Sequence, residues 1–398
     1  MSNKKGSDKR TTARILQPLT FTYKNIHASW PILLDLYPPR NLESGDGGLT
    51  PRPSVVYFHG GGLTVGNRTS WFPYWLEDRV TAAGMAFISV DYRLIPPSTG
   101  HHIIEDIKDL FHFLSSNLNT SIHDRHEATK DSTEPKSPLF EIDPSRIAVA
   151  GTSAGGLCAY LSVVHAEPKP KALLALYAMG GDFTLSHYLV PKTSVFFRGR
   201  EMLDPKSFAE YLPPDCGGLE STSGSLLAYH PATAPIPGYP ANPRMLLARL
   251  YLQLGNFLDI YTGTERLSDV LRSVFSSTPA SQYDTDGNAI MEPTTNDMLW
   301  QKLRDISPKD IILFPQLHID SSWPPVLLVH GSADTAVRVD ESYHVQYLLK
   351  KANVPVKLRV VPNREHSFDY ASDAEEAYGQ SGGLFDEIQS FLVQTLHP

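Results

Sequence analysis

Short apolar runs alternate along this chain with longer segments in which apolar residues recur every three or four positions. The short runs predict β-strands and the periodic segments predict amphipathic helices. Eight strands are expected, at Leu19–Ile26, Ile32–Tyr37, Ser54–His59, Ala86–Tyr92, Arg146–Ala150, Ala172–Tyr177, Val326–His330 and Val356–Val361. Helices are expected at about Trp71–Ala83, Ile103–Leu118, Ala154–Glu167, Glu341–Ala352 and Gly382–Leu396. The central runs are almost wholly apolar, which favours an α/β fold with a mostly parallel sheet covered by helices on both faces.

Three segments interrupt this alternation. Residues 1–18 precede the first strand, and residues 121–141 are polar, charged and contain proline, which predicts a disordered surface insertion. Residues 183–322 separate the sixth strand from the seventh; they begin rich in proline and then become amphipathic. We therefore expect a catalytic core of residues 19–182 and 323–398, with a cap or lid formed by residues 1–18 and an inserted helical segment, 183–322.

Composition narrows the possible partners. The 398 residues suit one large domain with an insertion, and the formal net charge of −8 argues against nucleic acid as a partner. Two cysteines, Cys158 and Cys216, are too few for a disulfide framework or a cysteine-based zinc site. No secretory leader is visible and no apolar run is long enough for a membrane span, so we expect a cytoplasmic protein. We expect it to be a monomer or a homodimer. No pattern indicates a metal or another cofactor.

The sequence Gly151-Thr152-Ser153-Ala154-Gly155 follows an apolar strand and opens a helical segment. A strand that ends in G-x-S-x-G and turns at once into a helix is typical of a nucleophile elbow. Such a turn is too tight for side chains two residues before and after the serine, which explains both glycines. It exposes the Ser153 hydroxyl and places the backbone N–H of Ala154 beside it.

Acyl transfer through a serine also needs a base, an acid that orients this base, and donors for the developing oxyanion. The segment His59-Gly60-Gly61-Gly62 ends the third predicted strand and is suited to an oxyanion loop. Asp334 follows the seventh strand and His366 follows the eighth, which gives the order serine, acid, histidine. Asp182 and Asp340 remain alternative acids, and His330 is the main competitor for the base.

These motifs together resemble the hormone-sensitive-lipase-like branch of the α/β-hydrolases, which includes plant carboxylesterases and bacterial esterases. The matching residues are His59 to Gly62, Asp91-Tyr92-Arg93-Leu94, Gly151 to Gly156, Gly331 to Asp334 and His366 to Phe368. The resemblance implies an α/β-hydrolase fold with eight strands and a cap. It also implies ester hydrolysis by a Ser153-His366-Asp334 triad through an acyl-enzyme, with Gly60, Gly61 and Ala154 as oxyanion donors.

The chain departs from the family pattern around the site. Thr152, Pro97, Leu63 and Ser367 stand where the family commonly has aspartate, glutamate, an aromatic residue and glycine, respectively. Substrate preference therefore cannot be transferred, and we expect a neutral, fairly apolar ester or lactone. One alternative keeps the fold for biosynthetic tailoring, by acyl transfer or by aldol or elimination chemistry without net hydrolysis. Another is a small-molecule receptor that lacks catalysis, although the gibberellin receptor of this family lacks the histidine that is present here as His366.

Overall fold

The computed structural model describes residues 17–26, 30–40, 42, 50–130, 139–275 and 295–397. Within these ranges, eight strands form one sheet in the order β1-β2-β4-β3-β5-β6-β7-β8. The strands are β1 (Leu19–Asn25), β2 (Pro31–Tyr37), β3 (Arg52–Phe58), β4 (Ala86–Val90), β5 (Ile142–Thr152), β6 (Ala172–Leu176), β7 (Val326–Gly331) and β8 (Val356–Val361). β2 pairs antiparallel with both β1 and β4, and the remaining neighbours are parallel. The predicted mostly parallel sheet is confirmed.

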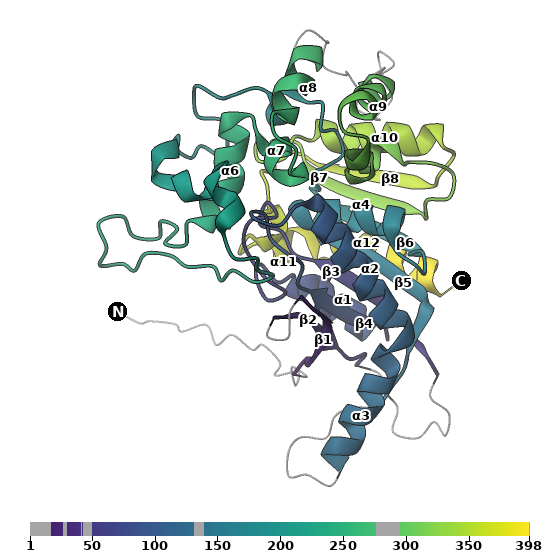
Figure 1. Ribbon diagram of the computed structural model, residues 1–398. Coiled ribbons are helices and arrows are strands. Elements are labelled where there is room, and N and C mark those ends of the chain that lie inside the picture. The colour runs from purple at the N-terminus through teal and green to yellow at the C-terminus, as the bar shows by residue number, and fades with distance from the viewer. Residues whose placement is uncertain are drawn as a thin grey trace, which may run out of the picture.

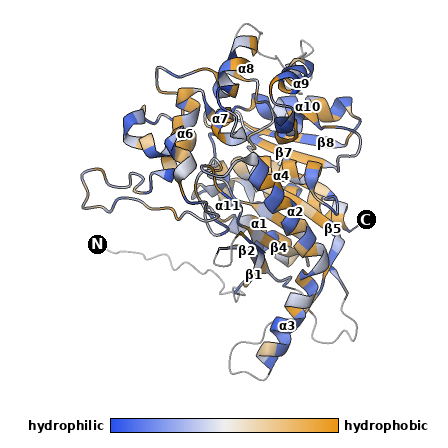
Figure 2. Cartoon of the chain, viewed as in Figure 1, coloured by the Kyte–Doolittle hydropathy of each residue, from blue (hydrophilic) through white to orange (hydrophobic). Residues whose placement is uncertain are grey.

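Helices cover both faces of the sheet (Figure 1). The helices outside the long insertion are α1 (Tyr74–Ala82), α2 (Gly100–Ser116), α3 (Leu118–Lys130), α4 (Ala154–His165), α10 (Asp340–Lys351), α11 (Ala374–Tyr378) and α12 (Leu384–Leu396), with a short 3-10 turn, η5 (Phe368–Tyr370). Buried residues of α2, α4 and α10 share one hydrophobic cluster, and those of α1, α11 and α12 share the other. The sheet thus lies between two helical layers, and its central strands are hydrophobic along their length (Figure 2).

β3 shows why its apolar run is continuous. Val56 and Phe58 pack into the α2–α4 cluster, whereas Val55 and Tyr57 pack into the α1–α12 cluster. All four side chains are at most 1% exposed. Successive residues of a strand point to opposite faces, so a strand buried on both sides has no polar alternation.

The insertion between β6 and β7 is largely helical. Its elements are α5 (Ser186–Leu189), η1 (Pro205–Tyr211), η2 (Asp215–Gly218), α6 (Arg244–Leu254), α7 (Phe257–Thr262), α8 (Leu267–Phe275), α9 (Thr295–Ile306), η3 (Pro308–Leu313) and η4 (Pro315–Leu317). Gly255 and Gly263 end α6 and α7 in the left-handed conformation that helix termini favour. The amphipathic part of the insertion thus includes two successive helices, α6 and α7, which are separated at Gly255.

One arginine ties the insertion to the core. The Arg244 guanidinium of α6 donates to the carbonyl oxygens of Thr64 (3.2 Å), Ile95 (3.4 Å) and Pro96 (2.6 Å). In return, the Thr64 hydroxyl donates to the Arg244 carbonyl oxygen over 2.9 Å. Because Arg244 is only 9% exposed, these charge-assisted bonds hold α6 against the loop that follows β3.

The expectation of disorder over residues 121–141 is wrong for its first half. α3 continues to Lys130, and the Asn119 side chain both donates to and accepts from the backbone of Ile142. Leu118 and Ile122 are the only residues of α3 that are buried, so its sequence is too polar to show helical periodicity. The helix is held by these few contacts at its first turns. Residues 131–138, like residues 1–16 of the expected cap, lie outside the described ranges.

Parallel strands bring their carboxyl ends to the same edge of the sheet, where ligands bind in open α/β folds. The segments that follow β3, β5, β7 and β8 carry Gly60, Ser153, Asp334 and His366, respectively. In the described part of the chain, no helix combines the length and the apolar character needed to cross a membrane.

Candidate active site

Ser153 lies at the sharp turn between β5 and α4. Its backbone has φ 55° and ψ −121°, a conformation that residues with a side chain rarely adopt. A Cβ atom on Gly151 would lie 2.1 Å from the Gly155 carbonyl oxygen, and one on Gly155 would lie 2.0 Å from that of Phe58. The two glycines are therefore required by space, and the strained turn presents the Ser153 side chain to the cavity.

Backbone donors face the same cavity from the loop after β3. Gly60 and Gly61 line the cavity beside Ser153, and a Cβ atom on Gly60 would lie 3.4 Å from the Ser153 Cβ. Gly61 has φ +113°, which only glycine adopts readily. Within the described ranges, the N–H groups of Gly60 and Gly61 have no hydrogen-bond acceptor. The Ala154 N–H lies at the start of α4, where helices leave donors unsatisfied.

His59 shapes this loop from beneath. Its Nδ1 donates to the Gly60 carbonyl oxygen over 2.7 Å, and its ring stacks on Tyr92 at 4.5 Å. The Tyr92 hydroxyl donates to the His59 carbonyl oxygen over 2.7 Å. Burial lowers the pKa of His59 to about 4, so the ring is neutral at pH 7. His59 therefore orients the glycine loop and is absent from the cavity lining.

The buried histidines predict that acid weakens the fold. Burial lowers the pKa of His59 and of His187 to about 4, against 6.5 in an unfolded chain. Between these values the unfolded chain binds protons that the folded chain does not. Each of these two histidines is therefore expected to lower the free energy of unfolding by about 1.4 kcal/mol per pH unit as the pH drops from about 6.5 towards 4, whereas buried Glu341, whose pKa is raised to about 8, contributes in the opposite sense.

Urea denaturation at pH 7, 6 and 5 measures this slope. The variant His187→Gln keeps a donor for the Ala336 carbonyl oxygen that His187 Nε2 contacts at 2.9 Å, but it cannot titrate. The change in its free energy of unfolding with pH is expected to be smaller than that of the unmodified protein by the contribution of one histidine. An identical slope in both proteins would refute this origin of the acid sensitivity.

His366 and Asp334 form a hydrogen-bonded pair. The His366 Nδ1 lies 2.7 Å from the Asp334 Oδ2, and these side chains are 9% and 0% exposed. An ionised carboxylate can only accept, so Nδ1 carries the proton and Nε2 is left as an acceptor. The Tyr177 ring packs edge-on against the His366 ring at 4.7 Å and limits its rotation.

Asp334 is held as a carboxylate. Its Oδ1 accepts the backbone N–H groups of Ala336 and Val337, both over 2.9 Å. Burial alone would raise the pKa of Asp334, but the His366 charge and hydrogen bonds from His330 and His366 hold this pKa well below its usual range. The carboxylate can therefore orient His366 and stabilise its protonated form.

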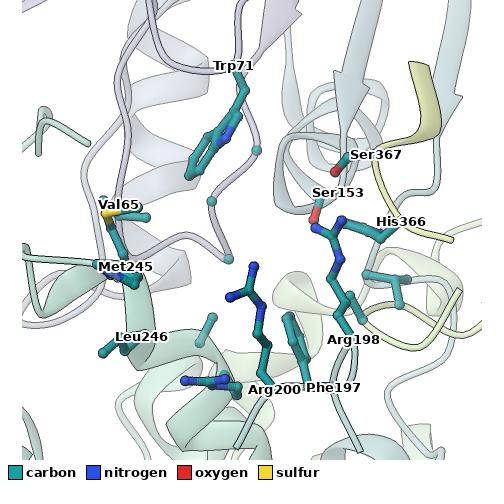
Figure 3. Close-up of a pocket in the computed structure, with 18 of the residues that line it drawn as sticks. Val65, Trp71, Ser153, Phe197, Arg198, Arg200, Met245, Leu246, His366 and Ser367 are labelled. Atoms are coloured by element: carbon teal, nitrogen blue, oxygen red, sulfur yellow. The ribbon is translucent and has the colours of Figure 1, made fainter. Parts of the chain in front are cut away.

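Ser153 and His366 line one cavity of about 280 Å³ (Figure 3). No hydrogen bond joins the Ser153 hydroxyl to the His366 ring; both side chains point into the shared space. The opposite wall comes from the insertion, chiefly from Met245, Leu246 and other residues of α6. Since a Cβ atom on Gly62 would lie 2.2 Å from the Cβ of Ala248, α6 packs directly on the glycine loop.

The alternative acids and the alternative base lie outside the cavity lining, although His330 Nε2 is 3.3 Å from the Asp334 Oδ2. Asp182 is buried and accepts from the Thr184 backbone and hydroxyl, over 2.9 and 2.6 Å. Asp340 starts α10 and contacts Arg338. His330 is fully buried, with Nδ1 at 2.7 Å from the Ser342 hydroxyl oxygen and Nε2 at 3.0 Å from the Val337 carbonyl oxygen. None of the three lines the cavity.

Several lining residues carry no signal in the sequence. Trp71 and Tyr177 line the core side of the cavity, and Arg198, Arg200 and Arg249 line its cap side. The arginines fall in or after an irregular, proline-containing stretch, where no periodic pattern predicts which side chains face inward. No group of three or more His, Cys, Asp or Glu side chains in the described ranges is placed to hold a metal ion.

Ser367 shows how one family departure is accommodated. It has φ 63°, in the left-handed region that glycine favours, directly after His366. Leu63 likewise has φ 64° directly after the glycine loop. Ser367 thus adds a side chain to the cavity lining on a backbone suited to glycine, whereas Leu63 is buried in the core outside that lining.

Known proteins match the chain in two parts. Residues 55–213 match the model of an α/β-hydrolase-fold family, and residues 275–390 match that of the prolyl oligopeptidase family. A probable carboxylesterase, M8, of a Phoma species is 24% identical over 74% of this chain and 85% of its own. A non-reducing polyketide synthase of Aspergillus calidoustus is 23% identical over 91% of this chain but only 13% of its own, so the chain spans about an eighth of that relative.

Solved structures show the same fold. An esterase of Pyrobaculum calidifontis superposes with a TM-score of 0.51 at 17% identity, over 96% of this chain and 85% of the other. A Staphylococcus aureus protein of unknown function reaches a TM-score of 0.54 at 16% identity, over 95% and 99% of the two chains.

Proposed function

Because the chain is an α/β-hydrolase of the hormone-sensitive-lipase-like branch, we propose that it hydrolyses carboxylic esters through an acyl-enzyme on Ser153. The observation that carries this proposal is the joint placement of Ser153, the His366–Asp334 pair and the unsatisfied N–H groups of Gly60 and Gly61 around one cavity. Residues 183–322 act as the cap that selects the substrate in this proposal.

In the first half-reaction, the Ser153 oxygen attacks the ester carbonyl carbon while His366 Nε2 takes the hydroxyl proton. The negative charge that develops on the carbonyl oxygen is stabilised by the N–H groups of Gly60, Gly61 and Ala154. Each such donor contributes about 3 kcal/mol to transition-state stability. When the tetrahedral intermediate collapses, the C–O bond to the alcohol breaks and His366 returns the proton to the leaving alcohol.

In the second half-reaction, His366 removes a proton from water, whose oxygen attacks the acyl-enzyme. The carboxylic acid leaves and Ser153 regains its proton from His366. The Ser153–His366 hydrogen bond needed for these steps often tightens only when substrate is bound, so its absence from the free site is compatible with the mechanism.

A panel of 4-nitrophenyl esters from acetate to laurate tests the proposal. The cavity of about 280 Å³ lies below the usual range for drug-sized ligands, so short and medium acyl chains are expected to react fastest. The matching 4-nitroanilides measure whether an amide is also cleaved, which the prolyl oligopeptidase match makes worth testing. No hydrolysis of any ester across the panel would contradict the proposed function.

A second candidate is release or transfer of an acyl group in a biosynthetic pathway. It is favoured by the matches to three non-reducing polyketide synthases, which cover 87 to 92% of this chain. The same acyl-enzyme can form from a thioester and pass its acyl group to an alcohol or amine in place of water. Conversion of a thioester without appearance of free acid, in the absence of 4-nitrophenyl ester hydrolysis, would favour this candidate.

A further inference from the structure

The cap side of the cavity carries an excess of positive charge. Three arginines, Arg198, Arg200 and Arg249, line the cavity, and among the described lining residues Glu201 is the only one with a carboxylate. The whole chain has a formal net charge of −8, so this local excess runs against the composition of the protein. A cluster of one sign in a concave site raises the local concentration of ligands of the opposite sign.

Two of these arginines have partners within the protein. The Arg198 Nε lies 3.5 Å from the Glu365 Oε2, and its backbone N–H donates to the Thr335 hydroxyl over 2.8 Å. Thr335 and Glu365 are neighbours of Asp334 and His366, so Arg198 joins the cap to the loops that carry this pair. The Arg249 guanidinium lies 3.1 Å from the Glu201 carboxylate.

Arg200 and Arg249 have N–H groups that are available to bind a further anion. The Arg200 guanidinium has no hydrogen bond or ion pair with any described residue, and it extends into the cavity beside Phe197 (Figure 3). The Arg249 side chain is only 6% exposed and also hydrogen-bonds Tyr239, yet its buried Nε has no hydrogen-bond partner among the described groups. An unpaired buried guanidinium N–H costs free energy unless a ligand satisfies it.

We propose that the substrate carries, besides its ester or thioester bond, an anionic oxyacid group that Arg200 and Arg249 bind. This inference rests on the proposed function and deepens it. The planar guanidinium matches carboxylate and phosphate oxygens through paired hydrogen bonds, whereas a neutral ester offers only weak acceptors. The group that binds is a carboxylate on the acyl part or a phosphate on the leaving group. The apolar residues of α6 contact the rest of the substrate.

Two matched substrate pairs distinguish these sources. For the acyl side, the 4-nitrophenyl monoester of glutaric acid is compared with 4-nitrophenyl 5-methylhexanoate, in which an isopropyl group replaces the carboxylate. For the leaving group, the butanoyl thioester of 4′-phosphopantetheine is compared with that of pantetheine, which lacks only the phosphate. In one pair, kcat/KM is expected to be about tenfold higher for the anionic member. This ratio corresponds to the free energy that one charge-assisted hydrogen bond contributes.

Substitutions assign this preference to the cavity. Arg200→Gln is expected to reduce the anionic-to-neutral ratio of kcat/KM about tenfold, and Arg200→Lys is expected to retain part of it. Arg266→Gln is the matched control, because the Arg266 side chain is 83% exposed and does not line the cavity; it should keep the unmodified ratio. Neutral members that react as fast as anionic ones in both pairs, or a ratio unchanged by Arg200→Gln, would overturn the inference.

Binding separates failure of this inference from failure of the proposed function. If no ester or thioester is turned over, calorimetry replaces the kinetic readout. It compares 4-nitroglutaranilic acid with the 4-nitroanilide of 5-methylhexanoic acid, and 4′-phosphopantetheine with pantetheine. The inference would be upheld, although the proposed function had failed, if an anionic member binds more tightly than its neutral partner and Arg200→Gln abolishes this difference. Equal or absent binding in both pairs would overturn both.

Discussion

Replacing Ser153 with alanine is expected to lower kcat for 4-nitrophenyl esters about a million-fold while the fold is retained. The hydroxyl oxygen is the atom that bonds to the acyl group in the proposed mechanism. The other described hydroxyl groups in the cavity lining belong to Thr152, Ser367 and tyrosines. Alanine fits the turn, because the Ser153 hydroxyl makes no hydrogen bond with a described residue. The backbone N–H at position 153 still donates to the Leu176 carbonyl oxygen in the variant.

Steady-state kinetics with circular dichroism and thermal unfolding measure this effect. Ser162→Ala is the matched control, since Ser162 lies on the same helix, α4, where its hydroxyl donates to the Cys158 carbonyl oxygen. The control is expected to keep nearly all activity. Ester hydrolysis by Ser153→Ala at more than a small fraction of the normal rate would show that Ser153 is not the nucleophile.

The second large effect is expected at Asp334, whose substitution by asparagine should lower kcat about ten-thousandfold. The asparagine amide can turn its NH₂ towards His366 Nδ1, which then becomes an acceptor and leaves the proton on Nε2. The ring would then have no free nitrogen to take the Ser153 proton, and the positive charge formed during attack would lose its carboxylate partner.

Asp182→Asn separates this role from a general effect of removing a buried carboxylate. Asp182 is one of the alternative acids, and as a whole residue it is 2% exposed, as is Asp334. Its carboxylate accepts hydrogen bonds from Thr184 and Gln316. An asparagine there can still accept from Thr184, so most of kcat should remain. Similar losses of kcat in the two variants would argue against the Asp334–His366 pairing as the cause.

The core of the fold could be predicted from the sequence because burial on both sheet faces leaves a strong pattern. The strand over Val356–Val361 agrees with the structure at both ends, and the other strands begin and end within a few residues of their expected bounds. The candidate triad and glycine loop could be proposed because each follows such a strand directly. Their positions at one sheet edge then follow from parallel topology.

The cap side of the cavity could not be predicted in this way. Arg198 and Arg200 lie on an irregular segment whose placement depends on distant contacts, such as the bond from the Arg198 backbone to Thr335. α3 was missed for a related reason, because it buries only Leu118 and Ile122 and is fixed by Asn119. Local patterns do not record such long-range contacts.

The most direct test of Ser153 as an acyl-accepting nucleophile is covalent labelling with a fluorophosphonate, followed by mass spectrometry of proteolytic peptides. In this reaction the Ser153 oxygen bonds to phosphorus and fluoride leaves. We expect one adduct per chain, on Ser153, which forms much more slowly in His366→Ala. No adduct in the unmodified protein would contradict this role of Ser153 and would favour a binding protein without catalysis. An adduct only on another residue would contradict it by identifying a different nucleophile.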